Sequence, residues 1–116
     1  MSFAIKEFQM ETSIKMEAEE KYLHALVGKI FKLLPIREEG DAFLAYAQGL
    51  QRELSGCESI LPRVAFDHDW ASILAVLANI IDGGDTFAKF RRDVFRMISL
   101  CETLISRHFY GGIDDE

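Results

Sequence analysis

The run from Trp70 to Ile81 constrains the fold more than any other stretch of this chain, because Ser72 and Asn79 are its only polar residues. The run is too short to cross a membrane, which takes roughly 20 apolar residues, so its side chains must be buried within the protein. A helix that is apolar nearly all round is normally an interior helix. We therefore expect a central helix over residues 69–82, with the rest of the chain packed around it.

Helical spacing gives this central helix one bulky face and one face of small residues. Successive residues turn by about 100° around a helix axis. The large side chains that share one side are Trp70, Ile73, Leu74, Leu77, Ile80 and Ile81. The opposite side carries Ser72, Ala75 and Asn79, with Val76 on its flank. The bulky side predicts the core contact, and the small side predicts close approach of another backbone, from this chain or a second copy.

Three further segments show apolar residues at helical spacing. One helix is predicted over residues 14–34, and it ends before Pro35 because the residue before a proline is pushed out of the helical region. Another helix is predicted over residues 41–54. The last is predicted over residues 85–108, where apolar residues follow one another at intervals of three or four from Phe87 to Phe109.

The two ends of the chain carry weaker signals. Within residues 1–13, the apolar residues Phe3, Ile5, Phe8 and Met10 do not keep one period. This segment is expected to be an arm, whether a short strand, a first helical turn or a partly ordered stretch, that lies on the bundle or is exchanged between subunits. Residues 113–116 are expected to form a short acidic tail.

Length and composition fit one helical domain. A chain of 116 residues is enough for a single core, and a hydrophobic fraction of 49% argues against disorder. Four helices with short connections favour an antiparallel four-helix bundle. The sequence therefore predicts an all-α fold that occupies residues 1–116 as one domain.

Charge and cysteine usage bear on location and partners. The formal net charge of −6 disfavours non-specific binding to nucleic acid or anionic lipid. The sequence shows neither a signal peptide nor a membrane-spanning run, so the expected location is the cytoplasm. Cys57 and Cys101 are far apart in the sequence and are expected to be free thiols in that reducing compartment.

The sequence holds no recognisable catalytic, cofactor-binding or metal-binding motif, so we expect neither an enzyme nor a cofactor. His24, His68 and His108 do not stand at the spacing of metal ligands. Asp67, His68 and Asp69 are the one tight group of potential ligands, and capping of the following helix by Asp67 or Asp69 accounts for this group.

The leading functional hypothesis is therefore a non-enzymatic protein that binds another protein, with a homodimer as one form. The predicted self-association face comprises Ala42, Ala45, Gly49, Ser72, Ala75, Val76 and Asn79. A glycine inside a helix costs about 1 kcal/mol relative to alanine. A close helix contact at Gly49 would offset that cost.

A basic face on the last predicted helix offers an alternative. It comprises Lys89, Arg91, Arg92 and Arg96. Such a face would dock an acidic protein or a phosphate backbone, unless ion pairs with neighbouring acidic residues already occupy it. No aromatic residue is evident on the face, which further disfavours binding of single-stranded nucleic acid.

A second alternative rests on the segment His24-Ala-Leu-Val-Gly28. Over these five residues the chain resembles the HxLKG motif of histidine phosphotransfer domains, which are also helical bundles of about this size. The resemblance implies that His24 would accept the phosphoryl group and that Gly28 would be its small neighbour. Val27 stands where that family has a lysine.

Overall fold

The computed structural model describes the backbone of residues 2–110 and the side chains of residues 16–109. Every regular element in that part of the chain is helical, which confirms the predicted all-α class. The elements are α1 (Ser2–Phe31), α2 (Leu33–Ile36), a 3-10 turn (Arg37–Glu39), α3 (Asp41–Ser55), a 3-10 turn (Glu58–Ile60), α4 (His68–Asp82), α5 (Phe87–Ile105) and a π-helical turn (Ser106–Tyr110). No helix within residues 2–110 is long and apolar enough to cross a membrane.

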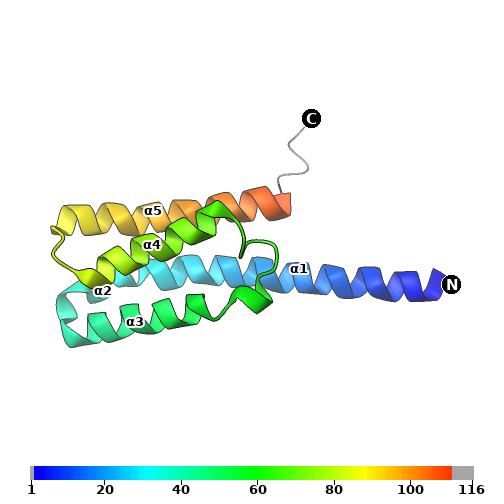
Figure 1. Cartoon of the computed structure of the whole chain (residues 1–116), viewed down its shortest axis with the longest axis horizontal. Helices are drawn as coiled ribbons and strands as arrows, with labels where there is room; N and C mark the ends of the chain where they lie inside the picture. The colour runs from blue at the N-terminus through cyan, green and yellow to red at the C-terminus, as the bar shows by residue number, and fades with distance from the viewer. Residues whose placement is uncertain (1, 111–116) are drawn as a thin grey trace.

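The four long helices lie side by side as a bundle (Figure 1). Helix α5 packs against both α1 and α4, and α3 packs against α4. Helices α1 and α3 run in opposite directions, because Tyr22 contacts Glu53 while the later Lys29 contacts the earlier Tyr46. The colour gradient in Figure 1 shows the same alternation from α3 to α4 and from α4 to α5.

The bulky face of the central run lies in the core, as its periodicity predicts. Trp70, Ile73 and Leu77 are all essentially inaccessible to solvent. They pack with apolar residues from the other three long helices and from the 61–66 loop. Representative members of this core are Leu23, Leu26, Ile30, Phe43, Ala47, Leu54, Leu61, Val64, Phe90, Val94, Met97 and Leu104.

The opposite face of α4 differs from the prediction. Ala75 and Asn79 are exposed, whereas Val76 is buried in the core. Helix α4 is therefore one of four neighbouring helices and is not an interior helix covered on every side by this chain. Since each helix of such a bundle buries one side, the small residues of α4 can face outward with little apolar surface in water.

Helix α1 is longer at its start than the sequence predicts. It begins at Ser2, so residues 2–13, predicted as an arm, continue the helix. This N-terminal part projects beyond the other helices (Figure 1). At its other end α1 stops at Phe31, and Pro35 lies in the short helix α2. The predicted boundary at residue 34 combined these two helices.

The loop after α3 is tied to α1 by a buried carboxylate. Leu61 and Val64 are buried and belong to the hydrophobic core at this end of the bundle. Glu19 is 2% exposed; its Oε2 accepts the backbone N–H of Arg63 over 2.9 Å and its Oε1 lies 3.3 Å from Arg63 Nη1. A buried carboxylate needs such donors to offset its loss of water. Phe66 of the same loop stays 92% exposed.

Candidate interaction surfaces

The bundle is open along the seam between α1 and α3. A groove of about 680 Å³ follows this seam, and we call it the α1–α3 groove. It is lined by Ala25, Gly28, Lys29, Lys32, Ala45, Tyr46, Gly49, Leu50 and Glu53. A methyl group built on Gly28 or Gly49 would meet no atom within 4 Å outside its own helix. The seam is open because small residues on both helices leave this space unfilled.

A polar cluster joins α1 to α3 along the groove, and Lys29, Tyr46 and Glu53 of this cluster also line it. The Tyr22 hydroxyl donates a hydrogen bond of 2.5 Å to Glu53 Oε2, and Lys29 Nζ donates one of 2.6 Å to the same oxygen. The Tyr46 hydroxyl donates to the Lys29 carbonyl oxygen over 2.7 Å. The Cys57 thiol lies 2.9 Å from the Glu53 carbonyl oxygen and 3.2 Å from the Tyr22 hydroxyl. These bonds fix the separation of α1 and α3 at this point.

The pKa values of Tyr22 and Glu53 move in opposite directions, each away from neutral pH. Burial raises the pKa of Tyr22, and its hydrogen bonds with Cys57 and Glu53 raise it further. The pKa of Glu53 is lowered by its hydrogen bonds from Lys29 and Tyr22, against a smaller opposing effect of burial. The Tyr22 phenol therefore stays protonated and the Glu53 carboxylate stays ionised, and the hydrogen bond between them joins α1 to α3. This pair does not suit proton transfer, which works best when a pKa lies near the working pH.

The residues of the predicted self-association face do not lie together on one surface. Ala45 and Gly49 line the α1–α3 groove, together with Ala25, Gly28, Lys29 and Lys32 of α1, which are not part of the predicted face. Ala42 is exposed on α3. The α4 members do not line this groove, and Val76 is packed in the core of its own chain. Of the α4 set, Ser72 is half-buried, and Ala75 and Asn79 are exposed on the outer side of that helix.

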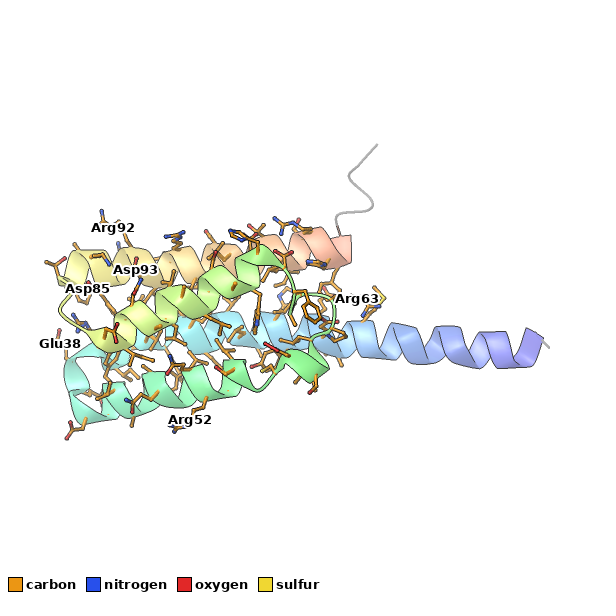
Figure 2. All side chains as sticks on the ribbon, viewed as in Figure 1. Glu38, Arg52, Arg63, Asp85, Arg92 and Asp93 are labelled. Atoms are coloured by element: carbon orange, nitrogen blue, oxygen red, sulfur yellow. The ribbon has the colours of Figure 1, made fainter. Side chains whose placement is uncertain are left out.

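The predicted basic face is partly neutralised by its own helix. Lys89 Nζ lies 3.4 Å from Asp85 Oδ1 and 3.3 Å from Asp93 Oδ2. These hydrogen bonds, first with Asp93 and then with Asp85, raise the pKa of Lys89. Arg92 and Arg96 are exposed, and Figure 2 shows Arg92 pointing away from the bundle.

An aromatic pair lies at this basic face, so the expectation that the face carries no aromatic residue is wrong. Phe95 of α5 and Phe31 of α1 meet edge to face with centroids 6.1 Å apart, and they remain 39% and 49% exposed. The Arg91 guanidinium lies 5.0 Å from the centroid of Phe95. Phe95 stands one helical turn after Arg91, so spacing along α5 could have predicted this contact, whereas Phe31 reaches the face from another helix.

His24 is exposed on the bundle surface, as the resemblance to histidine phosphotransfer domains implies for an acceptor. Its side chain is 57% exposed, and its Nε2 lies 3.5 Å from Glu20 Oε2. It borders a hollow of about 330 Å³ together with Val27 and Glu102. The carboxylates of Glu20 and Glu102 would repel a phosphoryl group at this position.

The group from Asp67 to Asp69 caps α4. Asp67 Oδ1 accepts the Asp69 backbone N–H over 2.8 Å. The Asp67 carboxylate also binds Arg107 Nη1 at 2.8 Å and His108 Nε2 at 2.7 Å, so it ties the start of α4 to the end of α5. His68 is exposed. Across the described side chains, no group of three or more histidine, cysteine, aspartate or glutamate residues could hold a metal ion.

Comparison with known proteins adds no assignment. No protein-family model, curated protein or solved structure matches this chain significantly. The class that the fold defines is thus an all-α four-helix bundle, and its function has to be argued from its own surfaces.

Proposed function

We propose that this protein is not an enzyme and works by binding another protein, and that it takes an amphipathic helix of its partner in the α1–α3 groove. The observation that carries this proposal is the open seam itself, with unfilled space above Gly28 and Gly49. An amphipathic helix that lays its apolar face into a groove is a recurring mode of recognition. Small residues on both walls let a third helix approach to a normal packing distance of about 8–10 Å.

The charges around the groove favour an acidic polar face on the incoming helix. Lys32 is exposed at the groove, while Lys29 is held by Glu53. Leu50 supplies an apolar floor between the two helices. The partner helix that fits this lining has small or medium apolar residues toward Leu50 and a carboxylate within reach of Lys32.

The ties across the seam support binding because they keep the groove formed in the free protein. Tyr22 with Glu53, and Tyr46 with the Lys29 carbonyl, join α1 to α3 without filling the space between them. A site that is formed before binding avoids part of the ordering cost that association otherwise carries.

The test is to fill the groove without damaging the bundle. Gly49→Leu and Gly28→Leu place side chains in the empty space, and both replace a glycine within a helix by a better helix former. We expect unchanged or higher thermal stability together with loss of the proteins that the wild-type chain captures from cells. Ala71→Leu, at an exposed position of α4, is the matched control. If the Gly49→Leu chain captured the same proteins as wild type, the groove would not be the binding site.

The aromatic pair favours a second candidate surface for an acidic protein partner. Phe95 exposes its ring beside Arg91, and Phe31 exposes the ring that packs on Phe95. Exposed rings beside a guanidinium suit an acidic segment that carries an apolar residue. Binding there should weaken with salt and be lost in Arg91→Glu.

We also propose that the protein resides in a reducing compartment such as the cytoplasm. Cys57 and Cys101 are both free and both buried, and disulfides are rare where thiols are kept reduced. Mass analysis of the alkylated native protein, with and without prior reduction, would show both thiols unpaired.

A further inference from the structure

A stripe of four residues runs along the outer surface of α5, on the side where this helix meets α1. We call it the α5 stripe, and its members are Arg91, Phe95, Ile98 and Glu102. Arg91 and Glu102 are exposed, Phe95 is 39% exposed, and Ile98 is partly buried. Among the described side chains, no ion pair engages Arg91 or Glu102. Figure 1 shows α5 along one edge of the bundle, where a second molecule can reach it.

The α5 stripe has the same spacing from either end but opposite charges at its two ends. Its members are separated by four, three and four residues, so a guanidinium and a carboxylate enclose an aromatic and an aliphatic side chain. These intervals are those of the contact positions in paired helices. A stripe of this kind is complementary to a copy of itself that runs in the opposite direction.

We propose that the α5 stripe binds the α5 stripe of a second copy, with the two helices antiparallel about a two-fold axis. This inference rests on the second surface of the proposed function, at Phe95 and Arg91. The acidic segment with an apolar residue that suits this surface is then Ile98 to Glu102 of the second copy. Because a two-fold pair uses the same surface twice, each contact occurs twice.

Helix geometry allows these contacts together. Arg91 and Glu102 are 11 residues apart, which is three turns and about 20°, so they lie on the same flank of α5. Arg91 can therefore stand opposite Glu102 of the second copy at both ends. Phe95 and Ile98 lie between these positions within about 60° of each other, and they interleave with Ile98 and Phe95 of the second copy.

The surroundings of the α5 stripe fit the antiparallel arrangement. Ala88 and Ser99, on the outward side of the stripe, are exposed and small, so they let the second α5 come close. Phe31 of α1 packs on Phe95 and widens the apolar centre. A parallel pair would instead set Arg91 beside Arg91 and Glu102 beside Glu102, where like charges repel.

The first test is the mass of the full chain in solution. The α5 stripe is about 17 Å long, so the interface is small, and interfaces at the low end of the size range belong to weak, transient complexes. Sedimentation equilibrium up to millimolar chain concentration should therefore show the mass rising from 13.2 kDa toward twice that value. A mass that stays at the single-chain value over the whole series would overturn the proposal.

Charge exchange between two variants tests the pairing itself. Arg91→Glu and Glu102→Arg each set like charges opposite one another at two symmetric places, and we expect each to weaken self-association by about tenfold. When the two variants are mixed, one chain is acidic at both positions and the other is basic at both. Every contact then joins opposite charges again, so the mixture should associate as tightly as the wild-type chain. A mixture that associates no better than the separate variants would exclude the antiparallel pairing.

The matched control is Arg96→Glu, which makes the same change of charge at an exposed position on a different side of α5. It should leave self-association unchanged, and weakening equal to that of Arg91→Glu would contradict the proposal. Capture of proteins from cells separates this inference from the surface on which it rests. A chain that stays monomeric but still binds another acidic protein through Arg91 would exclude self-association and leave the second surface in place. Loss of both would exclude the two together.

Discussion

The Tyr22 hydroxyl of α1 and the Glu53 carboxylate of α3 are joined by a hydrogen bond of 2.5 Å across an otherwise open seam. Lys29 Nζ reaches the same carboxylate oxygen over 2.6 Å. Ala25, Gly28, Ala45 and Gly49 leave much of the rest of the seam unfilled. The polar contacts therefore join α1 to α3 across the open side of the seam, above the core that both helices share.

The phenol should contribute more to stability than the ion pair does. Tyr22→Phe removes a hydrogen bond to a charged group and should lower the free energy of unfolding by about 1.5–3 kcal/mol. Lys29→Met should cost only about 0–1 kcal/mol, because the Lys29 and Glu53 side chains are 41% and 37% exposed. Urea denaturation followed by the fluorescence of Trp70, the one tryptophan, measures both. A larger cost for Lys29→Met than for Tyr22→Phe would reverse this ranking.

The buried Glu19 carboxylate should stabilise the loop after α3. Glu19→Ala leaves the backbone N–H of Arg63 without its acceptor, whereas the Arg63 guanidinium, 30% exposed, can turn to water, so we expect a loss of about 1–3 kcal/mol. Glu19→Gln keeps an oxygen for the backbone N–H and should cost less. The exposed Glu17→Ala should stay within about 0.5 kcal/mol of wild type.

Limited proteolysis gives this prediction a local measurement. Cleavage in the loop between residues 58 and 66 should be fastest in Glu19→Ala, since α1 no longer holds Arg63 there. Equal cleavage in Glu17→Ala and Glu19→Ala would show that the carboxylate does not hold the loop.

Local periodicity predicts where the helices lie in the sequence better than it predicts which helices pack against one another. The bulky side of α4 is recognisable because the spacing of Trp70, Ile73 and Leu77 depends on that helix alone. On α5 intervals of three and four from Phe87 lead to Ile98, yet Ile98 is only partly buried whereas its neighbour Met97 is fully buried. Helix α5 packs against α1 on one side and α4 on the other, which widens its buried face beyond a single stripe.

The candidate site is predictable only in part, for the same reason. Ala45 and Gly49 were selected as small residues, but their opposing wall belongs to α1, and no pattern within α3 indicates which helix lies there. Tyr22 and Glu53 are 31 residues apart, and neither stands out in its own segment. The projecting start of α1 was missed because a helix without neighbours in its chain need not keep one apolar face.

The Cys101 thiol should be inert in the folded protein. Burial, together with the charge of Glu102, raises its pKa to about 12. At pH 8 the thiolate, which is the reactive form, is then about one part in 10⁴, against about one in ten for a thiol with the ordinary value of 9.0. In Cys57→Ser, where Cys101 is the remaining cysteine, alkylation should be about a thousandfold slower in the native state than in urea. Similar rates in both states would contradict this.

The Asp67 carboxylate that caps α4 should make the free energy of unfolding fall at acidic pH. Burial acts to raise the pKa of Asp67, but the Asp69 backbone N–H and the His108 and Arg107 side chains outweigh it and lower the pKa to about 2. The folded-state pKa lies below the ordinary value of 3.8, so ionised Asp67 stabilises the fold above about pH 4. This contribution is lost as the pH falls toward 2.

Asp67→Asn separates the charge from the cap, because asparagine also accepts the N-terminal N–H of a helix. We expect the variant to lose about 1–2 kcal/mol at pH 7, an amount reduced by solvent around the half-exposed Arg107. The difference from wild type should shrink steadily between pH 4 and pH 2. Urea denaturation at a series of pH values measures it, with the exposed Asp82→Asn as the control. A difference that stays constant over this range would show that the Asp67 charge is not what Arg107 and His108 stabilise.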